Sequence, residues 1–219
     1  MDQNKLDREL DGFTEWFHEW EQTARVLFTW TSGYADLLQQ EEFSKDLSAE
    51  ERRKYAKIIH RNIIHLCDQW GKVSSYLRLY YGDKITPETV HLSKVIAEIT
   101  EHLEYKGIGI KVEITDNLPS VRGHSSWLIQ AILGCITDWY YPTNRYEAKL
   151  THAIRADLAG EKIKVRVQTI SNADALYYPS TGVYLAMLVV EQLGGQLELD
   201  YTHQAAKVCF TLLPGSDST

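Results

Sequence analysis

The residues of this chain best suited to chemistry are a histidine and a glutamate that stand side by side, His18 and Glu19. A neutral imidazole is a good nucleophile, and a carboxylate that accepts its other ring proton fixes the tautomer and raises the nucleophilicity of the free nitrogen. If it is exposed, such a pair is adequate for accepting a phosphoryl group, with His18 as phosphoacceptor and Glu19 as orienting carboxylate. The alternative is a solvated surface histidine flanked by Trp16 and Trp20.

The other nucleophilic and metal-binding residue types form no comparable arrangement. His60 and His65 are five residues apart, which places them on different sides of a helix, so we expect no zinc site. Cys67, Cys135 and Cys209 are widely spaced, and each lies in an apolar pattern. That distribution is typical of buried free thiols in a reducing compartment, so we expect no metal, no disulfide and a cytoplasmic location.

Two long apolar repeats would position His18. Both advance in alternating steps of three and four residues, which is the heptad seam of helices that pack against partner helices. Ser48 and Glu51 predict a capping box that opens the second helix. Because Phe17 belongs to the first seam, His18 and Gln22 are expected on the exposed face of the first helix. The first seam comprises Leu10, Phe13, Phe17, Trp20, Ala24, Leu27, Thr31, Tyr34 and Leu38, and the second comprises Ala56, Ile59, Ile63, Leu66, Trp70, Val73, Leu77 and Tyr80.

The polar stretch between the two repeats, 39–48, is short enough to make the helices antiparallel neighbours. A two-helix hairpin with seams of this length cannot cover its own apolar surface. We therefore expect two hairpins to pair into a four-helix bundle in a homodimer. The alternative is a monomer whose hairpin packs on the rest of the chain.

The helical repeat ends near Gly82 and Asp83, and the sequence beyond mixes helices and strands. Together these elements predict an α/β sandwich, a sheet with helices on one face. The predicted fold class is therefore α+β, with a helical hairpin dimerisation domain at 1–83 and an α/β sandwich at 84–219. The predicted elements are an extended entry and helix at 90–103, a strand at 108–114, a helix at 125–140, strands at 147–157 and 161–170, a helix at 181–193, and strands at 196–201 and 206–213.

Composition restricts the partners of the chain. Its formal net charge of −7 argues against nucleic acid, because phosphate binding needs a basic surface. No apolar run approaches the roughly 20 residues of a membrane span, and the charged N-terminus does not resemble a signal peptide. We expect no membrane or nucleic-acid partner.

Four segments, taken in order, resemble the core of sensor histidine kinases. Residues 33–38 are similar to the end of the first dimerisation helix of that family, and residues 57–62 to the middle of the second. Residues 121–133 are similar to the run that leads into the kinase N box, and residues 181–195 to the second glycine box and its helix. The resemblance covers roughly residues 20–213, and it implies a dimerisation hairpin followed by an ATP-binding domain.

The positions that would bind ATP in this family depart from its pattern. The N box supplies asparagines, one of which helps to hold Mg²⁺, and this chain has Gly134 and Asp138 at the aligned positions. Asp138 could ligate Mg²⁺, but it would add a negative charge facing the triphosphate. Gly182 lacks its partner glycine because Tyr184 occupies that place, and a ring there obstructs the approach of backbone amides to a phosphate.

The remaining nucleotide elements of the family are missing. No Asp-x-Gly-x-Gly occurs, and residues 168–172 stand where the family places the aspartate that binds adenine. Only ten residues separate Ile170 from Thr181, where the resemblance implies a nucleotide lid of roughly 30 residues that closes over the phosphates. We expect ATP binding to be lost and no cofactor. An ATP-dependent kinase would need Asp138 and an unrecognised lid to work together.

The aligned phosphoacceptor position is also changed. Alignment on Gly33 places the acceptor histidine of the family at Gln22 and its helix-kinking proline at Leu27, and the amide nitrogen of glutamine is not a nucleophile. His18 and Glu19 keep the His-Glu pair of the family one turn upstream, and His60 and His65 are weaker candidates. The favoured hypothesis is a pseudokinase, a kinase-like protein without ATP binding, that docks a response regulator or a partner kinase. The alternative is a histidine phosphotransfer protein that carries phosphate on His18.

Overall fold

The computed structural model describes residues 3–40, 47–137, 150–171, 181–201 and 205–215. Side chains are described from residue 17 onward, except those of residues 19, 23, 171 and 201. The chain divides into two compact units, Met1–Ser74 and Ser75–Thr219.

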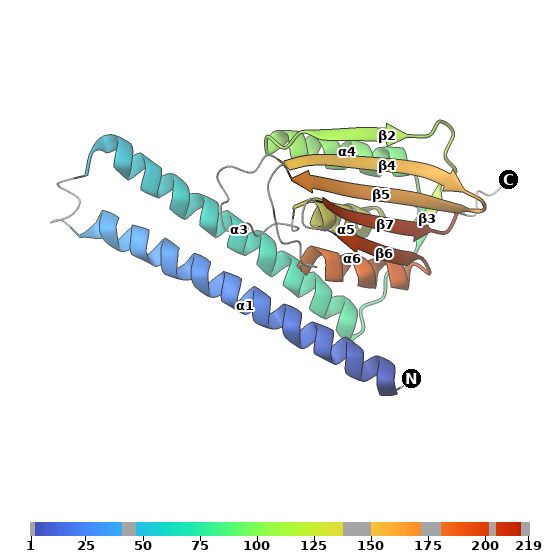
Figure 1. Ribbon diagram of the computed structural model, residues 1–219, viewed down its shortest axis with the longest axis horizontal. Coiled ribbons are helices and arrows are strands. Elements are labelled where there is room, and N and C mark those ends of the chain that lie inside the picture. The colour runs from blue at the N-terminus through green and yellow to red at the C-terminus, as the bar shows by residue number, and fades with distance from the viewer. Residues whose placement is uncertain (1–2, 41–46, 138–149, 172–180, 202–204, 216–219) are drawn as a thin grey trace. The chain divides into compact units, whose positions relative to one another are not determined.

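The first unit is an antiparallel hairpin of α1 (Gln3–Gln39) and α3 (Ala49–Tyr81), seen in Figure 1. Two aromatic contacts fix its register, because the rings of Trp20 and Trp70 lie 5.9 Å apart and those of Tyr34 and Tyr55 lie 5.1 Å apart. The capping box before α3 is confirmed: the Glu51 amide donates to Ser48 Oγ at 3.2 Å, and the Ser48 amide donates to Glu51 Oε2 at 2.8 Å.

The heptad seam of the hairpin is only partly covered within one chain. Leu27 of α1 and Val73 of α3 are buried, as expected of seam positions. On α3, however, Ile63 and Trp70 remain 47% and 61% exposed. Asn62, beside Ile63, is the buried residue instead. A single hairpin thus leaves large apolar side chains of its predicted seam open to water.

The second unit is a two-layer α/β sandwich, and its predicted elements are confirmed. A five-stranded sheet has the order β2-β4-β5-β7-β6, in which only β2 and β4 are parallel, and β1 pairs with β3 in a small separate sheet. The predicted helix at 125–140 is observed as far as Thr137, and residues 138–140 lie outside the described part of the chain. The elements are β1 (Glu88–Val90), α4 (Leu92–Tyr105), β2 (Ile110–Ile114), β3 (Val121–Gly123), α5 (Ser125–Thr137), β4 (Leu150–Ala159), β5 (Lys162–Ser171), α6 (Thr181–Gln192), β6 (Gln196–Tyr201) and β7 (Ala205–Leu212).

Helices α4, α5 and α6 lie on one face of the five-stranded sheet (Figure 1). Alternation along the strands produces this arrangement, because every second side chain of a strand points to the same face. The face toward the helices is buried and mostly apolar, with His152 and Thr169 as polar members, whereas the opposite, outer face carries charged side chains. The buried strand residues are Ile154, Ala156, Ile163, Val165, Val167, Ala206, Val208, Phe210 and Leu212.

Two glycines end α6 and turn the chain into β6. Gly194 has φ of +78°, a left-handed conformation that favours glycine, and the Gly195 amide donates to the Val190 carbonyl at 2.9 Å. A Cβ on Gly195 would lie 2.4 Å from the Thr211 carbonyl oxygen of β7. The Leu-Gly-Gly sequence is therefore a packing requirement of the sandwich.

Candidate functional site

The second unit brings α5 and α6 into direct backbone contact at two glycines. A Cβ on Gly134 of α5 would lie 2.6 Å from the Gly182 Cα and 2.9 Å from the Gly182 carbonyl oxygen of α6. Both glycines are buried, and Tyr184, one turn into α6, is half-buried. Sequence resemblance aligns Gly134 with the N box and Gly182 with the second glycine box, and the contact leaves no space for a ligand group between the two residues. Asp138 lies outside the described residues.

The strand positions aligned with the adenine-binding region hold no carboxylate on the buried face. Thr169 of β5 is buried, and its Oγ1 lies 3.0 Å from Nδ1 of His152 on β4, its cross-strand partner. Burial lowers the pKa of His152 because it disfavours the charged imidazolium. Sequence reasoning missed His152, although it alternates with Ile154 and Ala156 on the buried face of β4.

His18 is exposed on α1, and so is Gln22, one turn further along the helix. Both side chains therefore lie on the solvent-facing side of the hairpin, while the side chain of Glu19 is outside the described part. Trp20, between them in sequence, is half-buried and lies 5.5 Å from the ring of Phe17 and 5.9 Å from that of Trp70. His60 is exposed on α3 and His65 is half-buried.

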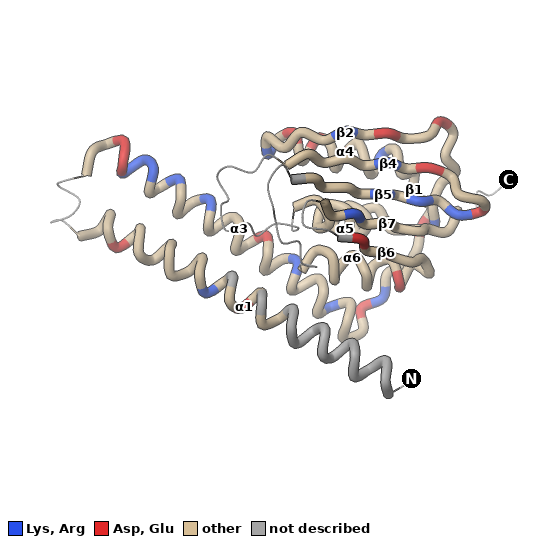
Figure 2. Tube along the Cα trace, in the orientation of Figure 1, with Lys and Arg blue, Asp and Glu red and all other residues tan. Residues whose placement is uncertain are grey.

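The N-terminal part of α3 carries a concentration of positive charge (Figure 2). Five of the ten residues in 52–61 are Lys or Arg and none is acidic, in a chain whose net charge is −7. Four of them, Arg53, Lys54, Lys57 and Arg61, recur at helical spacing and are all exposed. We call these four residues the basic stripe. It lies away from Tyr55, which contacts Tyr34 of α1.

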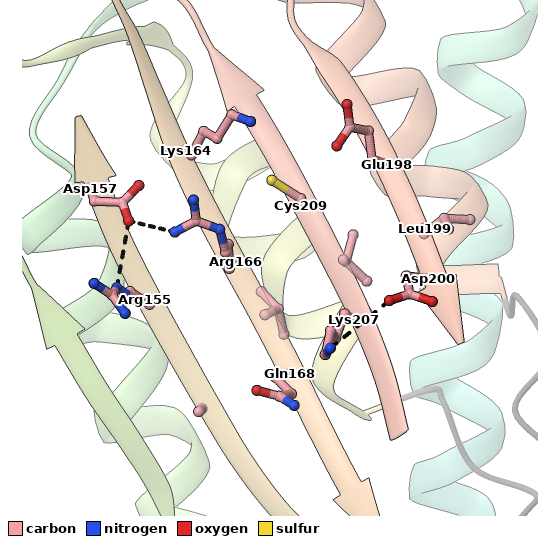
Figure 3. A pocket seen from close by; sticks show the side chains of 13 residues that line it. Arg155, Asp157, Lys164, Arg166, Gln168, Glu198, Leu199, Asp200, Lys207 and Cys209 are labelled. Atoms are coloured by element: carbon pink, nitrogen blue, oxygen red, sulfur yellow. Dashed lines mark hydrogen bonds and ion pairs between the residues drawn. The ribbon is translucent and has the colours of Figure 1, made fainter. Parts of the chain in front are cut away.

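The outer face of the sheet forms an open groove of about 760 Å³ (Figure 3). Asp157 lies at its edge and receives ion pairs from Arg155, at 3.5 Å, and from Arg166. On the other side Lys207 Nζ lies 3.9 Å from Asp200 Oδ2. The lining carries four cations, Arg155, Lys164, Arg166 and Lys207, and three carboxylates, Asp157, Glu198 and Asp200. This nearly balanced set does not mark the groove for a strongly charged ligand.

Cys209 lies between these charged pairs (Figure 3). Burial raises the pKa of its thiol, which therefore stays protonated and weakly nucleophilic near neutral pH. All three cysteines are free, and Cys135 is buried as expected. The expectation was wrong for Cys67, which is exposed, and Cys209 is only half-buried. Within the described ranges, no three His, Cys, Asp or Glu residues lie together in a group that could hold a metal ion.

The architecture, a long antiparallel helical hairpin followed by this mixed five-stranded sandwich, is the fold of the histidine kinase core. Solved structures with this fold include the Acinetobacter baumannii histidine kinase AdeS, with a TM-score of 0.62 at 10% identity, covering 91% of this chain and 98% of AdeS. The histidine kinase ThkA in complex with the response regulator protein TrrA aligns with a TM-score of 0.64 at 14% identity, over 99% of this chain and 66% of that one. Full-length ShkA in complex with AMPPNP aligns with a TM-score of 0.55 at 16% identity, over 89% of this chain and 46% of ShkA.

The likeness confirms the fold that the four sequence segments indicated. No family model matches the chain, and no curated protein matches it. In the part of the chain that the structure describes, no helix combines the length and apolarity needed to cross a membrane.

Proposed function

We propose that this chain is a dimeric pseudokinase of two-component signalling, which does not bind ATP and docks a response regulator or a partner kinase. The hairpin serves as the dimerisation domain, and the α/β sandwich is a degenerate ATP-binding domain. The observation that carries the proposal is the contact between Gly134 and Gly182, two positions that the resemblance aligns with the N box and the second glycine box. One of the similar structures is a kinase in complex with a response regulator protein, which supports a partner of that kind.

Two sets of residues support the loss of ATP binding, those aligned with the phosphate-binding positions of the family and those aligned with its adenine-binding positions. On the phosphate side, Tyr184 replaces a glycine and Gly134 replaces an asparagine of the family pattern. On the adenine side, Thr169 and His152 stand in the aligned region, where the Thr169 hydroxyl bonds to His152. A hydroxyl is a weaker acceptor for the adenine amino group than the carboxylate that the resemblance implies there. The expected cytoplasmic location is part of the same proposal, because free thiols persist in a reducing compartment.

Millimolar Mg-ATP is expected to leave the melting temperature of the protein unchanged. A ligand that binds only the native state at 100 times its dissociation constant would stabilise it by about 2.7 kcal/mol, which in a protein of this size raises the melting temperature by several degrees. Differential scanning fluorimetry measures the shift, with the histidine kinase AdeS as a control for an intact kinase of this fold. An ATP-dependent shift of several degrees in this chain would restore the kinase hypothesis, with Asp138 as the first residue to substitute.

Homodimerisation has support from the apolar side chains that a single hairpin leaves exposed. Phe17 on α1 and Ile63 and Trp70 on α3 belong to the heptad seams, yet each is at least 40% exposed. Large exposed apolar patches mark interaction sites. Burial of apolar surface is favourable by about 25 cal/mol per Å² removed from water. In a symmetric dimer the second copy contributes the same seam residues, so each copy covers the exposed apolar side chains of the other.

Docking of an acidic partner surface has support from the basic stripe. Its four cations lie on one exposed helix face about 12 Å long, from Arg53 to Arg61 at 1.5 Å per residue. That length suits one element of a protein partner, whereas the net charge of −7 of the whole chain would repel the phosphates of a nucleic acid. Complementary charge speeds association and selects among related partners.

The alternative function is histidine phosphotransfer, and the exposure of His18 favours it as the acceptor. In this reaction an imidazole nitrogen attacks the phosphorus of the aspartyl phosphate of a regulator. An N–P bond forms, the acyl O–P bond breaks, and the carboxylate of the regulator leaves. The imidazole proton is lost to a base, the role proposed for Glu19.

One experiment with a panel of response regulators separates these two functions. We expect one regulator to bind the wild type without transferring its phosphoryl label, and Arg53→Glu/Lys57→Glu to weaken this binding at least about tenfold. Calorimetry measures the affinity, and Lys94→Glu/Lys106→Glu is the control with the same change in net charge on exposed residues of α4 and its end. Acid-labile, base-stable label that His18→Gln abolishes would establish phosphotransfer instead. Equal binding by both double variants would refute the basic stripe as the docking face.

A further inference from the structure

The charges of the groove on the outer face of the sheet are divided between its two halves (Figure 3). Strands β4 and β5 form one half and β6 forms the other, with β7 between them. The half on β4 and β5 has three cations and one carboxylate, whereas β6 supplies two carboxylates. The charged members of the first half are Arg155, Asp157, Lys164 and Arg166, and those of the second are Glu198 and Asp200. The groove is therefore dipolar, although its total charge is nearly balanced.

One charge on each side of the groove is available to a ligand. Asp157 is bound by two arginines, and Asp200 Oδ2 lies 3.9 Å from Lys207 Nζ of β7. Within the described part of the chain, neither Lys164 nor Glu198 forms an ion pair. A cation on β5 and a carboxylate on β6 thus remain to bind groups of opposite sign.

The strand register fixes the separation of these charges. Arg166 of β5 pairs with Cys209 of β7, which pairs in turn with Glu198 of β6. Lys164 is two residues from Arg166 along β5, so both cations project from the same face of the sheet. Neighbouring strands lie about 4.8 Å apart, so β5 and β6 are separated by about 10 Å across β7. Cys209 lies between the two ends of this span (Figure 3).

This separation suits a ligand with a negative and a positive end, because a single small ion cannot contact both sides. An extended peptide advances about 3.3 Å per residue, so three residues with free ends place a carboxylate about 10 Å from an ammonium group. The guanidinium of Arg166 has five N–H donors, of which one on Nη1 bonds to Asp157, and it can bind the peptide carboxylate together with Lys164. At the other end Glu198 can accept from the peptide ammonium group.

We propose that the outer face of the sheet binds a short zwitterionic peptide of about three residues. Lys164 and Arg166 of β5 hold its carboxylate, Glu198 of β6 holds its ammonium group, and its middle crosses β7 over Cys209. The site lies on the face of the sheet opposite α4, α5 and α6 (Figure 1). The inference therefore depends neither on a docking partner nor on the loss of ATP binding.

Peptide binding is expected to protect Cys209 from alkylation, because a peptide that spans the groove covers a thiol of its lining. The probe is trialanine at about pH 7, where its amino group is mostly protonated. At about 20 mM it should slow the reaction of Cys209 with N-ethylmaleimide about threefold, the factor for a dissociation constant near 10 mM. Mass spectrometry of the digested protein measures the rate at each cysteine. Trialanine blocked at both ends should give no protection, and exposed Cys67 of α3 is the internal control whose rate should not change.

Neutral variants test the two charged contacts separately. Lys164→Gln and Glu198→Gln should each weaken trialanine binding about two- to fivefold, as the loss of one exposed ion pair does, and so lower the protection. Each variant is compared with and without peptide, because both charges also act on the Cys209 thiol. Glu101→Gln, at an exposed position of α4, is the control and should keep the protection of the wild type. Equal protection by the blocked peptide, no protection of Cys209 in the wild type, or undiminished protection in both groove variants would overturn the proposed site.

Discussion

Gly134→Val is expected to destabilise the α/β unit by about 3 kcal/mol, near the upper end of the usual cost of overpacking a well-packed core. The new Cβ would begin 2.6 Å from the Gly182 Cα, a backbone atom that cannot move without displacing α6. The measurement is hydrogen exchange of the β5 and β7 amides in increasing urea. Because these amides belong to the sheet, their exchange reports the free energy of unfolding of the α/β unit alone.

Gly33→Val is the matched control, because Gly33 also lies within a helix but has open space around its Cβ position. It should change the stability of the α/β unit by less than about 0.5 kcal/mol, as surface substitutions usually do. If Gly134→Val were as mild as the control, α5 and α6 could separate readily. The main support for the loss of ATP binding would then be gone.

Ile63→Glu is expected to convert a dimer into a monomer. Ile63 is 47% exposed in the single hairpin, so a glutamate there leaves the hairpin folded, but in a four-helix bundle it buries one unpaired charge per copy. Each uncompensated buried charge costs about 3 kcal/mol or more, so the dissociation constant should rise at least about a thousandfold. Light scattering over a dilution series measures the mass.

Leu158→Glu provides the matched control for Ile63→Glu. Leu158 is 53% exposed on β4, away from the heptad seams, so the same change of an exposed apolar residue to glutamate should leave the mass unaltered. Circular dichroism checks that the helices of both variants remain. A wild type that is monomeric at high concentration, or an Ile63→Glu variant that keeps the mass of the wild type, would contradict the proposed bundle.

The elements of this fold were predictable because their periodicities are local. Heptad steps, a capping box and the strand alternation through Ile163, Val165 and Val167 each follow from neighbouring residues. The face of α3 that meets α1 was not predictable to the residue. A heptad seam in a bundle divides its positions between two neighbours, and sequence does not say which of Asn62 and Ile63 faces which neighbour.

At the candidate site, the sequence could predict only which residues of the family pattern are missing. Missing glycines and a short lid segment can be seen in sequence, whereas the contact of Gly134 with Gly182 joins residues 48 positions apart. His152 escaped notice because a histidine in a strand gives no apolar signal, and its burial depends on Thr169 across the sheet. The division of charge across the groove likewise depends on tertiary structure, because only the order of the strands places β7 between β5 and β6.

The order of the sheet has a consequence for aggregation. Strands β2 and β6 lie at its two ends, so each presents backbone groups that another strand could pair with. Both carry charges at alternate positions, Lys111 and Glu113 on β2 and Glu198 and Asp200 on β6. A strand added at either end would bring its side chains against these charges, which disfavours growth of the sheet into fibrils. The α/β unit is thereby protected from joining copies edge to edge.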